Sequence, residues 1–304
     1  MLRLVFLGSS DFAVPVLTSL IADSGIEVGA VLTQPDRRAG RGRKITETPV
    51  SRRAAELGVP VKKPEKLREI RDWIQGMQPD VMVSAAYGMW LPLWLLETAP
   101  LGVVNVHPSL LPDYRGAAPV PRVILDGRHE TGVSFMLTDS GWDTGPLIHA
   151  VKTTVKPDET AGKLSHRLSL MAAEILPAVL REYSGGGMRP SPQVGQGSYA
   201  GKLTRKESML DWTKPADELE RAVRAFNPSP GAWFHFDGRI LKVFNARVCR
   251  GSGIPGTFSV LEHRRLMIAA GEGMLELLEV QPEAGKRMDS VSFIRGLRLP
   301  REQA

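Results

Sequence analysis

Short apolar runs alternate with helical patterns through the first 155 residues of the chain. The run at 2–7 ends at Gly8 and has the composition of a buried strand, and residues 13–22 carry a helical apolar pattern. Further strand-like runs lie at 27–33, 59–62, 80–85, 102–106, 133–137 and 147–155, with helical patterns at 49–57 and 66–77. Strands separated by helices favour parallel pairing, so we expect a Rossmann-like α/β fold, doubly wound around a mostly parallel sheet.

The pattern changes after a long amphipathic helix, which is expected from about Asp158 with a kink at Pro177. Residues 184–197 are rich in glycine and proline, which is typical of a linker. The remaining chain has short β-like runs separated by glycines and charges, which predict a smaller C-terminal β-barrel that is OB-like. These runs lie at 232–236, 239–247, 255–261, 264–269 and 274–280. We therefore expect a first domain at 1–184, a linker at 185–204 and a barrel domain at 205–304, the first able to fold alone.

The composition is that of an ordinary globular protein. Of 304 residues, 42% are hydrophobic and 24% are charged, which excludes disordered and fibrous chains. The longest uncharged stretch, at 81–96, has 16 residues, fewer than the ~20 that a membrane helix needs, so no membrane contact is expected. Cys249 is the only cysteine, which excludes an intrachain disulfide framework and favours the reducing cytoplasm.

Several common site motifs are missing from the sequence. No GxGxxG motif follows the first strand, which argues against a dinucleotide, and neither a P-loop nor an HExxH motif is present. The six histidines show no metal-ligand spacing, so we expect no metal. We also expect a monomer.

Basic charge is concentrated in one short segment. The net charge of the chain is +6, and the nine residues at 36–44 hold five basic side chains against one acid. Charge alone leaves two interpretations open, a solvated loop and a loop that faces phosphates. The basic residues are Arg37, Arg38, Arg41, Arg43 and Lys44.

Two polar residues stand at the end of the strand predicted near 102–106. Asn105 and His107 are two positions apart, so both project from the same face of a strand. Pro108 cannot donate to a sheet ladder, so pairing should stop there, at the carboxyl end where open α/β sheets hold their ligands. Both side chains can donate a hydrogen bond to a developing oxyanion. The alternative is an Asn and a His that only cap a turn.

An aspartate lies between two glycines further along. Asp143 is flanked by Gly141 and Gly145, whose conformational freedom can aim one carboxylate. Taken by itself, this motif is better explained by an ordinary Asp/Gly turn.

Together these segments resemble the folate-dependent formyltransferases. The resemblance rests on Asn-x-His followed by SLLP-x-Tyr-Arg-Gly, and then on the Asp-x-Gly-x-Asp-Thr-Gly segment at 139–145. The opening GSSDFAVP at 8–15, and AGKLTRKE at 200–207 with RAFNPSPGA at 224–232, extend it over almost the whole chain in order. The basic segment at 33–44 resembles the basic loop of the family member that acts on initiator tRNA.

The resemblance implies transfer of a formyl group from 10-formyltetrahydrofolate to the α-amino group of methionyl initiator tRNA, for translation initiation. Asn105 and His107 would hold the formyl oxygen, and Asp143 would accept the proton of the amine. The implied folate-binding residues are Ser109, Leu110, Leu111, Pro112, Tyr87 and Gly88, although the stretch around Tyr87 can also be read as buried core. The implied tRNA-binding residues are the five basic residues of 37–44.

Two other functions remain open from the sequence. One is a sister formyltransferase that acts on an amino sugar nucleotide, and the other is a catalytically idle RNA-binding protein. The basic segment favours the tRNA substrate, and the intact catalytic trio argues against an idle protein. The chain departs from the family pattern at Ser9, Asp113, Pro121 and Ser229, which leaves local folate and tRNA contacts undefined.

Overall fold

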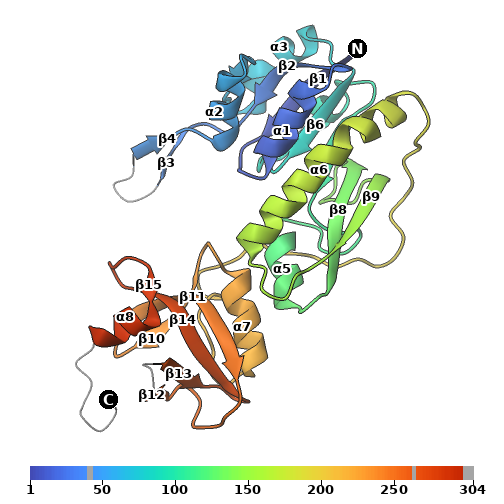
Figure 1. Ribbon diagram of the computed structural model, residues 1–304. Coiled ribbons are helices and arrows are strands. Elements are labelled where there is room, and N and C mark those ends of the chain that lie inside the picture. Colours follow the sequence, from blue (N-terminus) through green and yellow to red (C-terminus); the bar gives the residue numbers. More distant parts are fainter. Residues whose placement is uncertain (40–43, 262–264, 297–304) are drawn as a thin grey trace. The chain divides into compact units, whose positions relative to one another are not determined.

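The computed structural model describes residues 1–39, 44–261 and 265–296 (Figure 1). The chain divides into two compact units, and neither is continuous in sequence. The first unit comprises Met1–Gly116, Glu130–Thr154 and Ser165–Ala200. The second comprises Ala117–His129, Val155–Leu164 and the chain from Gly201 onward.

A seven-stranded sheet forms the centre of the first unit, in the order β5-β2-β1-β6-β7-β8-β9. The first five strands of this order pair in parallel, whereas β8 pairs antiparallel with both neighbours, so the predicted mostly parallel sheet is confirmed. The strands are β1 (Leu2–Gly8), β2 (Ile26–Leu32), β5 (Val61–Lys62), β6 (Val81–Ala85), β7 (Val103–His107), β8 (Glu130–Leu137) and β9 (Leu147–Thr154). β6 is buried along its whole length, as expected for a parallel strand covered on both faces.

Helices connect and cover these strands. They are α1 (Ala13–Ala22), α2 (Pro49–Glu56), the 3₁₀ turn η1 (Leu67–Ile70), α3 (Arg71–Gly76), α4 (Leu93–Leu96) and α6 (Ala161–Ser184). The Thr48 hydroxyl caps α2 by accepting from the Ser51 amide, and Pro49 follows at a position where no amide hydrogen bond is lost. Pro177 lies inside α6, which continues past it to Ser184.

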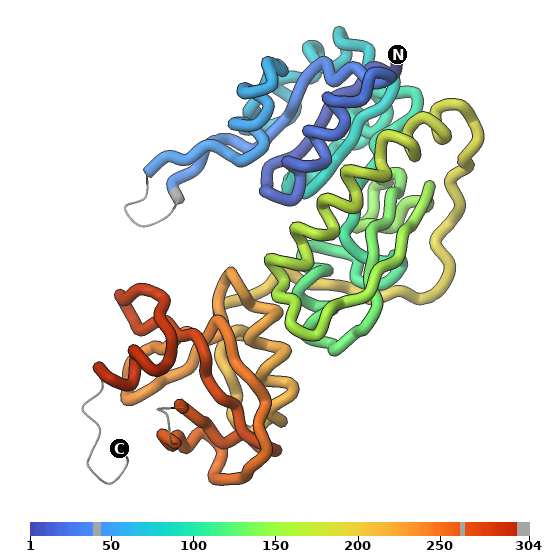
Figure 2. Tube along the Cα trace, in the orientation of Figure 1, coloured from blue at the N-terminus to red at the C-terminus, as the bar shows by residue number. Residues whose placement is uncertain are grey.

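The basic segment forms a hairpin, where the sequence predicted a loop. β3 (Arg37–Ala39) pairs antiparallel with β4 (Lys44–Thr46), and the hairpin extends away from the sheet of its unit (Figures 1 and 2). At its base Lys63 donates to Asp36 and to Glu47, which joins both arms to the strand β5 region.

The described part of the second unit has a small antiparallel sheet and three helices that lie wholly within that unit. Its strands pair in the order β10-β11-β14-β13-β12, with β15 on β14, and within the described residues the two ends of this path do not pair with each other. The predicted C-terminal antiparallel fold is thus confirmed as a six-stranded sheet. The elements are α5 (Pro119–Leu125), α7 (Ala216–Ala225), β10 (Ala232–Phe236), β11 (Arg239–Cys249), β12 (Phe258–Leu261), β13 (Arg265–Ala269), β14 (Met274–Pro282), β15 (Met288–Asp289) and α8 (Ser290–Arg295).

Sequence reading missed α5, although this helix belongs to the core of the second unit. Leu125 packs against the buried cluster of that unit, and its carbonyl accepts a hydrogen bond from Arg221 of α7. Arg122 of α5 donates to the Gly201 carbonyl and to Glu207. An early segment of the chain is therefore built into the C-terminal unit.

The segment expected to be a linker is bound to the first unit up to Ala200. Ser191 exchanges two backbone hydrogen bonds with Leu147, each of 2.8 Å. The backbones of Ser198 and Ala200 also form hydrogen bonds with the backbone of the loop at 112–115. The domain boundary at 184 stays a prediction. Residues 191–200, however, belong to the first unit and are hydrogen-bonded to it.

Candidate active site

Two of the predicted side chains lie at the carboxyl end of β7. Asn105 stands opposite Ser84 of β6, and His107 stands opposite Ser134 of β8. The two project from the same face of β7 because they are two residues apart. The side chain of His107 is buried and that of Asn105 is partly buried. Both residues therefore lie at the carboxyl end of an inner strand, as the sequence predicted.

The loop between β8 and β9 carries Asp143 in a left-handed conformation, with a φ of 53°. The carboxylate of Asp139 accepts from the Gly141 amide at 3.0 Å and from the Thr144 hydroxyl at 2.9 Å, which closes the loop on itself. Gly145 is required because a Cβ there would collide with the Leu137 carbonyl oxygen. This local structure directs the Asp143 side chain toward β7.

The carboxylate of Asp143 meets both β7 side chains. Asn105 Nδ2 donates to Asp143 Oδ1 at 3.4 Å, and His107 Nδ1 lies 3.5 Å from Asp143 Oδ2. The amide of Gly116 donates to Oδ2 at 2.7 Å, a short charge-assisted bond that sequence reading did not anticipate. Gly116 has a φ of 105°, and a side chain there would collide with Tyr199. Only glycine can therefore place its amide this close to the Asp143 carboxylate without strain.

The second ring nitrogen of His107 has a partner of its own. Nε2 lies 2.9 Å from the carbonyl oxygen of Tyr114, which can only accept, so Nε2 carries the proton. Nδ1 is then the nitrogen that faces Asp143. A proton on Nδ1 makes the ring an imidazolium paired with the carboxylate, and in this form the ring has a donor directed into the site.

The loop that follows β7 is held by buried serines. Ser109 Oγ donates to the Asp113 carbonyl at 2.7 Å, while Ser134 Oγ donates to the Ser109 carbonyl and accepts from the Leu111 amide. Of the predicted folate residues in this loop, Ser109 and Leu111 are buried, whereas Leu110 and Pro112 are partly exposed. The buried pair shapes the loop, and the exposed pair is available to a ligand.

The side chain of Tyr87, which the resemblance places in the folate site, is buried. It is 2% exposed, belongs to an apolar cluster, and its hydroxyl has no hydrogen-bond partner among the described residues. Burial raises the pKa of this hydroxyl to about 12. Its carbonyl already accepts from Ser9 Oγ and Gln34 Nε2. The side chain of Tyr87 thus lies in the core and Gly88 is exposed, while a part for either residue in folate binding stays a prediction.

Two exposed tryptophans join this region to the Asp143 loop. The rings of Trp90 and Trp142 lie 5.2 Å apart between centroids, although both side chains are more than half exposed. Trp142 directly precedes Asp143 in the chain. The contact brings the segment after Gly88 beside the loop that carries Asp143 and offers flat apolar surface there.

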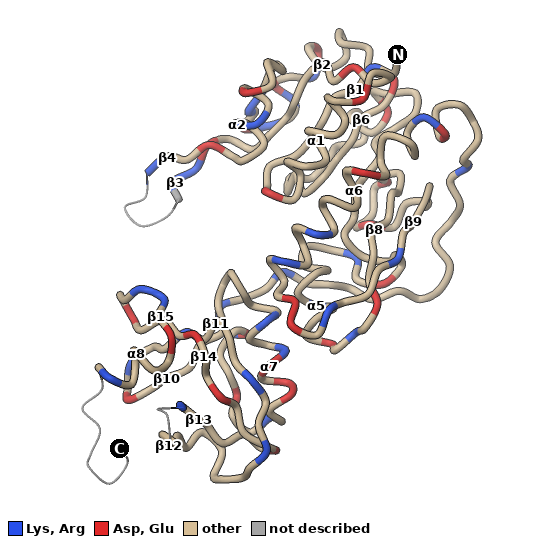
Figure 3. Tube along the Cα trace, in the orientation of Figure 1, with Lys and Arg blue, Asp and Glu red and all other residues tan. Residues whose placement is uncertain are grey.

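The residues predicted to bind tRNA lie on the hairpin, as far as they are described. Arg37 and Arg38 on β3 and Lys44 on β4 are exposed, and Figure 3 shows this basic charge on both strands. Arg41 and Arg43 lie outside the described residues. The hairpin is a basic feature separate from the Asp143 cluster in sequence.

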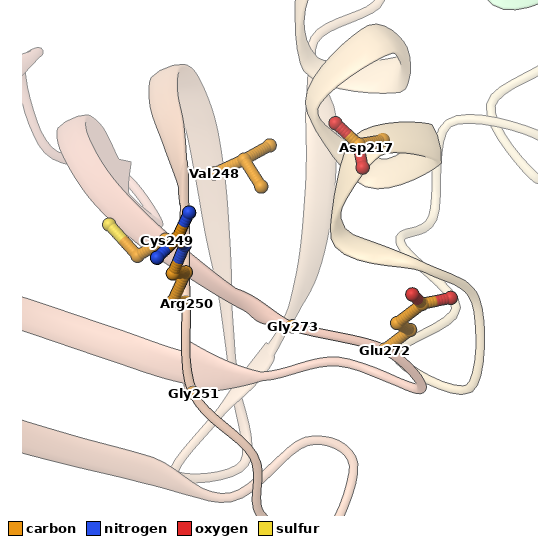
Figure 4. A pocket seen from close by; sticks show the side chains of 7 residues that line it. All are labelled: Asp217, Val248, Cys249, Arg250, Gly251, Glu272 and Gly273. Atoms are coloured by element: carbon orange, nitrogen blue, oxygen red, sulfur yellow. The ribbon is translucent and has the colours of Figure 1, made fainter.

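A pocket of about 400 Å³ in the second unit contains none of the predicted site residues. Figure 4 shows that the acids Asp217 and Glu272 line it together with Arg250. Within the described ranges, no group of three or more His, Cys, Asp or Glu side chains could hold a metal ion. Of the helices in those ranges, none combines the length and apolarity that crossing a membrane requires.

Comparison with known proteins matches both parts of the chain. A family model described as formyl transferase matches residues 2–180, and one described as formyl transferase, C-terminal domain, matches residues 202–298. The chain is 44% identical to a methionyl-tRNA formyltransferase of Halorhodospira halophila over 301 residues, which covers 98% of this chain and 97% of that protein. It is 43% identical to the enzyme of the same name from Myxococcus xanthus, covering 98% and 96%.

Solved structures resemble the fold at low sequence identity. The N-formyltransferase of Helicobacter canadensis, solved with folinic acid and dTDP-3-aminofucose, has a TM-score of 0.69 at 17% identity and covers 95% of this chain and all of that one. HypX of Aquifex aeolicus, solved with tetrahydrofolic acid, has a TM-score of 0.65 at 16% identity and covers 96% of this chain and 46% of that one.

Proposed function

The chain belongs to the formyl transferase family, and from this premise we propose that it transfers the formyl group of 10-formyltetrahydrofolate to the α-amino group of methionyl initiator tRNA. The choice of acceptor is supported by relatives of that activity at 40–44% identity over nearly the whole chain. The observation that carries the chemistry is the meeting of Asn105 and His107 with the Asp143 carboxylate at the edge of the sheet.

Asn105 and His107 are proposed to stabilise the formyl oxygen. Attack by an amine on the formyl carbon builds negative charge on that oxygen, and donors already in place lower the cost of this charge. Asn105 offers its amide. His107 offers Nδ1 only in the imidazolium form, because Nε2 is bonded to the Tyr114 carbonyl. The Asp143 carboxylate lies 3.5 Å from Nδ1.

Asp143 is proposed as the acceptor of the proton that the amine loses. Its carboxylate is 20% exposed, so it can be reached by a substrate amine or by one water. The Gly116 amide donates to Oδ2 and the Asn105 side-chain amide donates to Oδ1, which fixes the orientation of the carboxylate. No covalent intermediate on the protein is required, because the amine would attack the formyl carbon directly. The bond from that carbon to N10 of the folate would then break, and N10 would take up a proton as tetrahydrofolate leaves.

The residues around this cluster fit a folate. 10-Formyltetrahydrofolate supplies the formyl group when bound, and its fused and single rings need flat apolar surface with backbone polar groups at the edge. The chain offers exposed backbone at Gly88, the partly exposed Leu110 and Pro112, and the ring faces of Trp90 and Trp142. Ser109, Leu111 and Tyr87 support these groups from within.

The basic hairpin is the proposed contact with tRNA. Arg37, Arg38 and Lys44 are exposed cations, and such residues attract the phosphates of a polyanion. Arg41 and Arg43 belong to the same proposal from their sequence positions. The catalytic trio lies within one chain, so the proposed chemistry needs no residue from a second copy; that the enzyme is a monomer stays a prediction from the sequence. We propose that the enzyme acts in the cytoplasm, where ribosomes initiate translation.

The direct test offers two acceptors to the purified protein. It is incubated with 10-formyltetrahydrofolate and either methionyl initiator tRNA or an amino sugar nucleotide, and the product is identified by mass spectrometry. Formylated methionyl-tRNA supports the proposal. Formylation of the amino sugar alone would replace the acceptor by the sister activity, and formylation of neither would overturn the function.

A further inference from the structure

One side chain from the segment after α6 touches the backbone of the catalytic loop. Gln193 Nε2 donates to the Asp143 carbonyl and to the Gly145 carbonyl, both at 2.8 Å. Its Oε1 accepts from Arg115 Nη2 at 2.7 Å and from Arg115 Nε at 3.1 Å. Both hydrogens and both lone pairs of this amide are therefore used.

The orientation of the Gln193 amide follows from its partners. A guanidinium only donates, so the atom facing Arg115 must be the oxygen. The nitrogen then faces the two carbonyls, which only accept. Arg115 thus sets the direction of the amide, and a flipped amide would lose all four bonds.

These contacts close a ring around Asp143. The carboxylate is held by the amide of Gly116, whose neighbour in the chain, Arg115, holds Gln193, which in turn holds the Asp143 backbone. Asp143 needs this support because a left-handed φ of 53° is unfavourable for a residue with a side chain. A change in its backbone would move the carboxylate away from Asn105 and His107.

We propose that Gln193, oriented by Arg115, is a positioning residue that fixes the direction of the Asp143 carboxylate for proton transfer. The inference rests on the proposed function of Asp143. Gln193 does not reach the reacting groups itself, since its bonds go to main-chain carbonyls and to Arg115.

The segment that carries Gln193 has other attachments. Ser191 pairs with Leu147 through the backbone, and Ser198 Oγ accepts from the Tyr114 amide at 2.9 Å. Removing the Gln193 donors should therefore leave the segment in place and release only the Asp143 loop. This separates a positioning role from a role in folding.

The test is Gln193→Glu in the full-length protein. Glutamate keeps the size and the acceptor for Arg115, but it lacks both N–H donors and turns an oxygen toward two carbonyls. We expect kcat to fall about 10-fold to 10²-fold, as for a small misplacement of a catalytic group, with both KM values within about twofold. Gln196→Glu is the matched control, because Gln196 is exposed in the same segment and makes the same charge change.

Two further measurements tie the effect to Asp143. In an Asp143→Asn background, Gln193→Glu should cost less than about threefold, because residues that act through one group are not additive. Arg115→Met, which leaves Gln193 in place without its orienting partner, should lower kcat in the same direction. Thermal unfolding of every variant controls for loss of fold.

The possible results separate the inference from the function. Wild-type kcat in Gln193→Glu, a loss confined to KM, equal losses in Gln196→Glu, or full additivity with Asp143→Asn would each overturn the inference. Wild-type protein that formylates no amine would overturn the proposed function, and the inference with it.

Discussion

At the scale of single residues, the chemistry of the site depends on one carboxylate and on which proton each neighbour carries. Asp143 receives donors on both oxygens, and His107 directs its obligatory N–H away from it, to the Tyr114 carbonyl. The ring can therefore assist the formyl oxygen only when Nδ1 is also protonated. Asp143 and His107 should behave as one unit in kinetics.

We expect Asp143→Asn to lower kcat by at least ~10², because general base catalysis alone contributes ~10²–10⁴. The KM for tRNA should be unchanged, since the hairpin residues are untouched. Adding His107→Ala should then cost much less than it does in the wild type. Steady-state kinetics of the four proteins checks this, and fully additive losses would show that the two groups act independently.

Tyr87 gives a prediction about stability rather than catalysis. Its hydroxyl is buried without a partner in the described structure, so Tyr87→Phe removes a desolvated polar group at almost constant volume. We expect the free energy of unfolding to stay constant or rise by about 1 kcal/mol. The KM for 10-formyltetrahydrofolate should not change; a severalfold rise would instead restore the hydroxyl as a folate contact.

At the scale of elements, the β3–β4 hairpin and the β11–β13–β14 ladder use arginine in opposite ways. On the hairpin the described cations are exposed and available to a polyanion. In the ladder, the buried Glu276 accepts from Arg247 at 2.6 Å and from Arg265 at 2.9 Å, which ties three strands together. Substitutions on the hairpin should therefore affect tRNA binding, whereas substitutions in the ladder should affect the stability of the second unit.

We expect Arg37→Ala with Arg38→Ala to raise the KM for tRNA and to leave thermal unfolding unchanged. If both residues bind phosphate, the slope of log KM against log salt should fall by roughly 1 to 2, because each neutralised phosphate contributes close to one unit of slope. Lys152→Ala with Arg189→Ala removes the same charge from exposed positions outside the hairpin and serves as control. Equal effects in both double variants would indicate a non-specific charge effect.

Glu276→Gln should destabilise the second unit in a pH-dependent manner. Hydrogen bonds from Arg265 and then Arg247 outweigh desolvation and lower the pKa of Glu276 from 4.5 to about 2. A lowered pKa means that the carboxylate stabilises the fold above pH ~4.5, and that this contribution is lost as the pH falls toward 2. At neutral pH we expect a loss of about 3 kcal/mol, since one pKa unit corresponds to about 1.4 kcal/mol.

Denaturant unfolding of wild type and Glu276→Gln between pH 7 and 2 measures this contribution. The two curves should converge at the acid end, where the wild-type carboxyl is also protonated. A difference that stays constant over the whole range would mean that charge on Glu276 does not contribute.

At the scale of the whole molecule, the two units are interleaved along the chain. Residues 117–129 and 155–164 interrupt the first unit in sequence and belong to the second. The apolar side of α5 packs in the core of the second unit through Leu125. A cut after residue 184 therefore leaves α5 without its partners and removes the segment that carries Gln193.

Truncation tests this organisation. A chain ending at Ser184 should be less soluble than the full chain and should bind folinic acid weakly. One ending at Ala200 keeps the segment that bonds to Leu147 and to the loop at 112–115, and it should bind folinic acid better. Isothermal titration with folinic acid, with the full chain as reference, checks the order. Equal binding by both truncated chains would support the boundary at 184 that the sequence predicts.

Local pattern was sufficient for most strands and the longer helices, for the carboxyl end of β7 and for two side chains able to donate to an oxyanion. It did not reveal α5 or the β3–β4 hairpin. Period and composition act over a few neighbouring residues, so they locate β7 and its Asn105 and His107 without any knowledge of their partners. The resemblance in motifs then identified Asp143.

Tertiary structure decided which residues surround Asp143 and which segments pack together, because these contacts join residues far apart in the chain. Gln193 reaches Asp143 across 50 positions, α5 joins α7, and the Tyr87 side chain lies in the core rather than at the surface. Each of these depends on which surfaces the folded chain buries together, and burial is a property of the whole packed molecule rather than of any short segment.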